Sequence, residues 1–130
     1  MFRLVKVLNS NNQCTVAKLK YNPAAIIGPG CALSCLSGTL STPSNASMPD
    51  YISLVGNEGL TSDTLDAMFV NEDMVFKVEY TGSTAPYVGM SVGLSNGAYK
   101  MDSVTSNSSG KGTILALEDD KKLVYVRFRK

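Results

Sequence analysis

The chain has 130 residues, of which 44% are hydrophobic, and its 12 lysines and arginines nearly balance its 11 acids, giving a formal net charge of +1. This length is enough to bury a core without metal or disulfide support, and the charge balance argues against a disordered tail or a strong polyanion binder. The chain has no histidine, which removes the usual general base at neutral pH and the commonest transition-metal ligand. We therefore expect no enzymatic activity, no cofactor, and no catalytic or metal-binding residues.

The first residues predict neither export nor a membrane span. Arg3 and Lys6 interrupt the apolar residues near the start, so the segment lacks the unbroken apolar run of a secretory signal. The three cysteines, Cys14, Cys31 and Cys35, are an odd number, which is a poor basis for a disulfide framework in such a chain. We expect them to be reduced thiols.

Charge is distributed unevenly along the chain. Residues 1–20 carry four bases and no acid, residues 21–76 carry six acids and no base, and residues 77–130 carry eight bases and five acids. The 29 residues from 21 to 49 carry no charge at all. A solvated surface rarely has this composition, so residues 21–49 are either buried by their own domain or form a loop or arm that another subunit covers.

Alternation of apolar and polar residues predicts short strands separated by turns. The clearest cases are Met74–Tyr80 and Leu123–Arg129, the second with Phe128 facing inward. An Asn96-Gly97 dipeptide and the charged run 118–122 predict two hairpin connections. The further strand candidates are Phe2–Leu8, Cys14–Leu19, Cys31–Leu36, Tyr51–Val55, Met90–Leu94 and Thr113–Leu117.

One segment departs from the strand pattern and predicts a short helix near residues 62–70. A capping hydroxyl and early acids precede Leu65, Met68 and Phe69, which lie at helical spacing. About eight short strands with one short helix predict an all-β chain, folded as a small antiparallel β-barrel or sandwich. We expect residues 1–130 to form a single barrel-like domain, with residues 21–49 as an uncharged loop or arm.

Two motifs resemble functional sites, one for phosphate binding and one for acid-base catalysis, but their sequence context argues against both functions. Residues 109–113, SGKGT, echo a phosphate-binding loop, but Thr105 stands where that loop has a glycine, and the residues that follow are strand-like. The acidic pairs and runs at Glu72-Asp73 and 118–120 stand in predicted turns, where carboxylates normally point into water. We interpret both motifs as exposed turns.

Basic residues near the two ends of the chain leave a second function open. If the first and last strands pair, these residues form one basic patch close to Phe2, Tyr125 and Phe128. Small barrels that bind single-stranded nucleic acid combine such a patch with aromatic rings on which bases stack. The inward position predicted for Phe128 and the low net charge argue against this, so nucleic-acid binding is the alternative and a basic edge that faces a protein is preferred.

The second half of the chain has the spacing of a known group of proteins. Residues 87–94, Asn96-Gly97, residues 109–117 and residues 124–128 follow a pattern of glycine, strand, glycine-marked turn, small polar loop, glycine, strand, charged turn and a final Val-x-Val strand. Over residues 87–129 this resembles the small β-barrel capsid decoration (cement) proteins of tailed bacteriophages. The resemblance implies a non-enzymatic structural protein of the virion, made in the host cytoplasm and placed on the outer capsid surface. It carries over no functional residue, because the pattern marks only turns and core positions.

The expected partner is the lattice of the major capsid protein, with a homo-oligomer or capsid-assembled copies, and no membrane. Patches of opposite sign on one small subunit favour ordered head-to-tail or ring contacts. We predict that the apolar part of the interface consists of Ile26, Ile27, Leu33, Leu36 and Leu40. We predict that its polar rim consists of Arg3, Lys6, Arg127 and Arg129.

Overall fold

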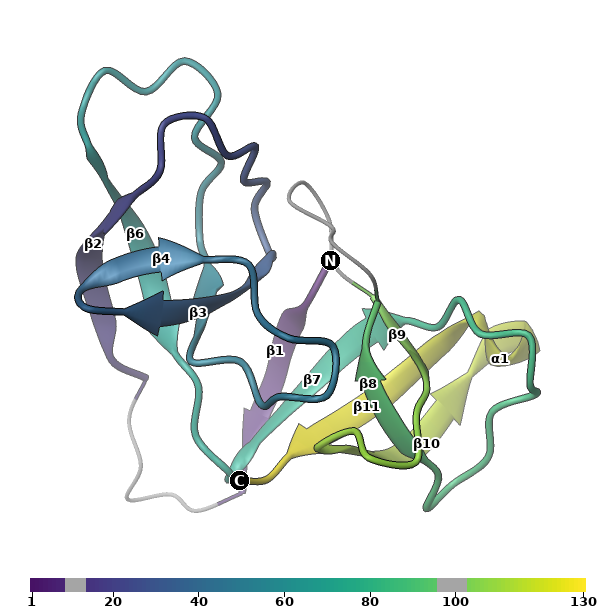
Figure 1. The fold of residues 1–130 in the computed structure, drawn as a ribbon. Coiled ribbons are helices and arrows are strands. Elements are labelled where there is room, and N and C mark those ends of the chain that lie inside the picture. Colours follow the sequence, from purple (N-terminus) through teal and green to yellow (C-terminus); the bar gives the residue numbers. More distant parts are fainter. Residues whose placement is uncertain (9–13, 96–102) are drawn as a thin grey trace.

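The computed structural model describes residues 1–8, 14–95 and 103–130, and these form eleven strands and one four-residue helix (Figure 1). The all-β prediction is therefore confirmed. Six strands form an open sheet in the spatial order β1 (Arg3–Val7), β7 (Met74–Glu79), β11 (Leu123–Phe128), β10 (Gly112–Glu118), β8 (Ser91–Leu94) and β9 (Val104–Ser106). Five strands form a closed barrel in the order β2 (Val16–Tyr21), β4 (Thr39–Ser41), β3 (Ala32–Leu36), β5 (Tyr51–Ser53) and β6 (Thr64–Phe69).

In the six-stranded sheet all neighbouring strands are antiparallel. Leu4 is opposite Phe76 in β7, and Phe76 is opposite Val126 in β11, so β7 lies between β1 and β11. The first and last strands therefore share a sheet without pairing directly. All five strands of the barrel lie between β1 and β7 in the sequence, so the barrel is an insertion into the sheet.

The alternation that predicted β7 and β11 also decides which residues they bury. Phe76, Val126 and Phe128 point to the inner face of the sheet and are almost completely buried. The rings of Phe2, Phe76 and Phe128 contact one another there, with centroids 5.8 to 6.3 Å apart. These inward-facing aromatic rings form the centre of the larger core.

The barrel has its own interior and also contributes to the larger core. Residues that point into the barrel include Tyr21, Leu33, Leu40 and Leu65. On its outer side, Ala32, Ile52 and Met68 pack against the inner face of the six-stranded sheet. The outer face of that sheet is consequently turned away from the barrel.

The uncharged stretch 21–49 is built into the barrel. It contains β3 and β4, and β4 pairs in parallel with β2, while the other neighbours in the barrel are antiparallel. The interpretation of this stretch as a loop or arm is therefore wrong for its strands. Self-burial explains the missing charges for the part of the stretch whose apolar side chains, such as Leu33 and Leu40, fill the interior of this chain's own barrel. Other parts of the stretch, Ile26 and Leu36 among them, are exposed.

The short helix predicted near residues 62–70 is wrong, because β6 occupies Thr64–Phe69. β6 lies between β2 and β5, and its backbone pairs with both strands. Leu65 and Ala67 alternate into the barrel interior while Met68 faces the sheet. The tertiary pairing thus overrides the local helical spacing.

The predicted hairpin at residues 118–122 is present, and β8 has an antiparallel partner that follows it in the sequence, β9, which begins at Val104. β8 and β9 pair with Val92 opposite Ser106 and Leu94 opposite Val104, although the Asn96-Gly97 turn itself lies outside the described residues. The charged connection between β10 and β11 contains α1 (Asp119–Lys122). No helix among the described residues is long and apolar enough to cross a membrane.

Candidate interaction surfaces

The four basic residues predicted as a polar rim lie on the outer face of the six-stranded sheet. Arg3 is opposite Lys77, and Lys6 is opposite Val75, which is in turn opposite Arg127. Two strand spacings, about 10 Å, separate β1 from β11. We call this surface the basic face; it consists of Arg3, Lys6, Lys77, Arg127 and Arg129.

Part of the basic face is neutralised by a network on its own surface. Lys77 Nζ lies 3.0 Å from Oε1 and 2.9 Å from Oε2 of Glu118, and the Tyr125 hydroxyl donates a 2.5 Å hydrogen bond to the same carboxylate. The hydrogen bond to Glu118 raises the pKa of Lys77 above its ordinary value of 10.5. The bonds from Tyr125 and Lys77 lower the pKa of Glu118 below 4.5. Both groups therefore stay charged at neutral pH and cancel each other.

Arg127 is also occupied within the chain. Its Nε donates a hydrogen bond to the carbonyl of Glu72, and its Nη2 lies 3.5 Å from Asp73 Oδ1. The backbone N–H of Lys130 donates to the Glu72 carboxylate, 2.8 Å away. These contacts hold the end of β11 against the turn between β6 and β7. The exposed bases of the basic face that have no ion pair among the described residues are Arg3, Lys6 and Arg129.

A groove of about 320 Å³ lies beside Arg127 and Arg129 on the same side of the sheet. Leu115, which is 40% exposed, lines it at a β-bulge between Ile114 and Ala116. We call this the Leu115 groove; its lining residues are Glu72, Thr113, Leu115, Arg127, Phe128 and Arg129.

A second surface lies at one end of the barrel, where two loops are joined (upper left in Figure 1). Asn57 holds them together: its Oδ1 accepts from the N–H of Ile27 at 3.0 Å, its Nδ2 donates to the carbonyl of Ala25 at 2.5 Å, and its own N–H donates to the carbonyl of Ile27. Ile26, between these anchored residues, is 52% exposed and lines a small hollow together with Glu58. We call residues 22–27 and 57–63 the barrel tip.

The structure divides the predicted apolar contacts into buried and exposed residues. Ile27, Leu33 and Leu40 are 3%, 1% and 1% exposed, so their assignment to a partner interface is wrong. All three pack in the barrel interior: Leu33 and Leu40 point inward from β3 and β4, and Ile27 enters it from the segment before β3. Leu36 and Ile26 remain on the surface, 73% and 52% exposed. The predicted interface residues that stay accessible are therefore Ile26 on the barrel tip, Leu36 at the end of β3, and the basic residues of the sheet.

Two of the three aromatic residues considered for base stacking are in the core. Phe2 and Phe128 are 3% and 1% exposed, and their ring centroids lie 5.8 Å apart. The third, Tyr125, is on the basic face, with its hydroxyl bound to Glu118. The basic face therefore carries positive charge, but the rings of Phe2 and Phe128, on which a base-stacking site would depend, are buried.

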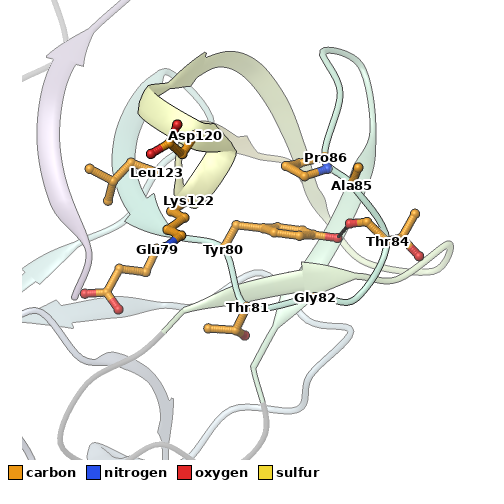
Figure 2. A pocket seen from close by; sticks show the side chains of 10 residues that line it. All are labelled: Glu79, Tyr80, Thr81, Gly82, Thr84, Ala85, Pro86, Asp120, Lys122 and Leu123. Atoms are coloured by element: carbon orange, nitrogen blue, oxygen red, sulfur yellow. Dashed lines mark hydrogen bonds between the residues drawn. The ribbon is translucent and has the colours of Figure 1, made fainter.

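A cleft with a volume of about 680 Å³ lies between the segment after β7 and α1 (Figure 2). The Tyr80 hydroxyl in this cleft donates to the carbonyl of Thr84 at 2.5 Å. The other ionisable residues that line it, Glu79, Asp120 and Lys122, do not supply a nucleophile paired with a base. The described residues also contain no group of three or more Cys, Asp or Glu side chains that could hold a metal ion. This cleft supports no catalytic assignment.

No protein-family model matches the chain, and no curated protein matches it. A solved structure is similar to it: the head fiber gp8.5 N base in bacteriophage phi29. The two share 14% sequence identity and superpose with a TM-score of 0.57, over 90% of this chain and 95% of the other. The likeness covers both the barrel and the six-stranded sheet. The chain therefore has the fold of a phage head-fiber base.

Proposed function

We propose that this chain is a non-enzymatic structural protein of a phage virion, which binds and stabilises the outer surface of the capsid as a decoration protein. The observation that carries the proposal is the likeness of fold to a phage head-fiber base over nearly the whole of both chains. Its localisation is accordingly the capsid surface, and its partner is the lattice of the major capsid protein.

The basic face supplies the polar part of the proposed contact. Arg3 and Lys6 are exposed on β1 and have no ion pair among the described residues, so their charges are available to a partner. Acidic side chains on the capsid surface are the complement of this edge. Complementary charges orient the encounter and disfavour contacts between surfaces of like sign.

Co-sedimentation with capsids that lack their outer accessory proteins tests the proposal. The chain should pellet with the particles at a fixed number of copies per capsid. The double variant Arg3→Glu, Lys6→Glu should bind weakly, whereas Lys20→Glu, which changes an exposed lysine on the barrel, should bind as the unchanged chain does. A chain that stays in the supernatant at every concentration would refute the proposal for those capsids.

Binding of single-stranded nucleic acid is the second candidate function, and the basic face is the observation that favours it. In that case affinity for an oligonucleotide should fall steeply with salt, and Arg127→Ala should reduce the slope. The burial of Phe2 and Phe128 favours the capsid proposal over this one. Titration of a labelled oligonucleotide at two salt concentrations separates the two functions.

A further inference from the structure

We propose that copies of this chain bind one another head to tail, with Ile26 on the barrel tip of one copy seated in the Leu115 groove of the next. The inference goes beyond capsid binding, because it concerns contacts between copies in the absence of any capsid. It rests on three observations: the rigidity of the tip, the match of charge between tip and groove, and the directions in which the two surfaces face.

The barrel tip presents an apolar side chain on a fixed backbone. The three hydrogen bonds of Asn57 to Ala25 and Ile27 hold the backbone on both sides of Ile26. A half-exposed isoleucine held in this way loses little conformational freedom when a partner buries it. Such preorganised apolar residues at the centre of a contact are typical binding anchors.

The barrel tip carries the two acids of residues 21–76 that have no ion pair or hydrogen-bonded carboxylate among the described residues, and one of them, Glu58, lines the hollow of Ile26. Of the six acids in residues 21–76, four are bound within the chain. Asp50 accepts the N–H of Cys35, Asp66 pairs with Lys18, Glu72 accepts the N–H of Lys130, and Asp73 pairs with Arg127. The other two, Glu58 and Asp63, are exposed on the barrel tip and have no ion pair among the described residues.

The Leu115 groove is complementary to this tip. Its volume of about 320 Å³ is that of about ten water molecules, which is more than the volume of the four carbons of an isoleucine side chain. Leu115 offers an apolar contact, and Arg129 supplies a positive charge that is exposed and unpaired among the described residues. Lys111, also exposed, is held next to Arg129, because its carbonyl accepts the N–H of Arg129. The one acid in the lining, Glu72, already accepts the N–H of Lys130.

Within one chain the tip and the groove cannot meet. The barrel packs against the inner face of the six-stranded sheet, and the groove opens on the outer face. The contact therefore joins different copies through two different surfaces. A contact of this kind closes into a ring when the rotation between successive copies permits it, and otherwise forms an open chain.

Sedimentation equilibrium of the purified chain alone tests the inference. The weight-average mass should rise with concentration above that of the monomer, and added salt should lower it, because part of the attraction is between charges. Ile26→Asp should raise the dissociation constant about tenfold or more, the loss typical of a central apolar anchor. The matched control is Leu36→Asp, which makes the same kind of change at a more exposed residue on another part of the barrel and should leave the dissociation constant unchanged.

Exchange of charges identifies the two surfaces. The variant Glu58→Lys, Asp63→Lys reverses the tip, and Arg129→Glu reverses the groove. Each variant alone should stay monomeric, because its tip and groove then carry charge of the same sign. An equimolar mixture should associate again, because the reversed tip of one variant complements the reversed groove of the other, and the unchanged groove of the first complements the unchanged tip of the second. The charge variants and Leu36→Asp should keep the circular dichroism spectrum and unfolding temperature of the unchanged chain, since the altered side chains are exposed, and Ile26→Asp should keep the spectrum.

Three results would overturn the inference: an unchanged chain that is monomeric at all concentrations, an equal loss on Leu36→Asp and Ile26→Asp, or a mixture of charge variants that does not associate. These results are separable from the capsid proposal, because no capsid is present. A monomer that still co-sediments with capsids would refute the contact between copies and leave the capsid proposal unaffected.

Discussion

Ile26 and Ile27 are neighbours of the same type in opposite environments, and truncating each to alanine should give very different losses of stability. Ile27 is 3% exposed in the barrel interior, and Ile26 is 52% exposed on the barrel tip. Truncation removes three carbons, which at about 0.8 kcal/mol per buried carbon amounts to about 2.4 kcal/mol for Ile27. The cavity left in the interior adds to this, so Ile27→Ala should cost about 3.5 kcal/mol in total.

Chemical and thermal unfolding followed by circular dichroism measure this cost. For 130 residues the entropy of unfolding is about 0.27 kcal/mol/K, so a loss of about 3.5 kcal/mol should lower Tm by about 13 °C. Ile26→Ala removes carbons that are half in water already and should cost about 1 kcal/mol or less. Equal losses for the two variants would refute the assignment of Ile27 to the core and of Ile26 to the surface.

Three further changes test the polar contacts and the packing. Asn57→Ala should cost about 1–3 kcal/mol in urea unfolding, because the N–H of Ile27 and the carbonyl of Ala25 lose their side-chain partner, and an unchanged midpoint would show that the Asn57 contacts do not hold the tip. Because the pKa of Glu118 is lowered, this carboxylate stabilises the fold above its ordinary pKa of 4.5, and the contribution is lost as the pH falls through the lowered value. Because the pKa of Lys77 is raised, this amine stabilises the fold below its ordinary pKa of 10.5, and the contribution is lost as the pH rises through the raised value. The difference in unfolding free energy between the unchanged chain and Glu118→Gln should therefore be level between these limits and shrink outside them, and a difference that does not vary with pH would contradict the network with Lys77 and Tyr125. Gly110→Ala should cost about 1–3 kcal/mol by thermal unfolding, because its Cβ would press on the backbone of Val92, whereas Ser109→Ala should leave Tm nearly unchanged.

The sequence predicts those elements whose local pattern and tertiary environment agree. β11 alternates cleanly, and β7 does so from Phe76 onward, while Val75 is buried as well as its neighbours Met74 and Phe76. Each strand has one face in the core, which is the pattern that a period of two predicts. Leu65, Met68 and Phe69 fit a helical spacing as well as the strand that forms, and only the pairing of β6 with β2 and β5 decides between the two. β4 has three residues, too few to show any alternation.

The interaction surfaces could be predicted only in part, for a similar reason. An uncharged segment has the same sequence pattern whether its own domain or another subunit covers it. The sequence alone therefore does not distinguish Leu33 and Leu40, which are core residues, from residues of a partner interface. The gathering of Arg3, Lys6 and Arg127 depends on β7, which lies between the strands that carry them. The hydrogen bonds of Asn57 span about 30 residues and leave no local signature in the sequence.

The insertion of the barrel into the sheet has a consequence for biosynthesis. β1 is translated first, but its pairing partner β7 leaves the ribosome only after all five barrel strands. Until then the nascent β1 is an unpaired strand, which is a template for aggregation. Arg3 and Lys6 stand in this strand, and charges in a waiting strand discourage it from joining another chain. The same two side chains that we assign to the capsid contact would thus also protect the chain while it is being made.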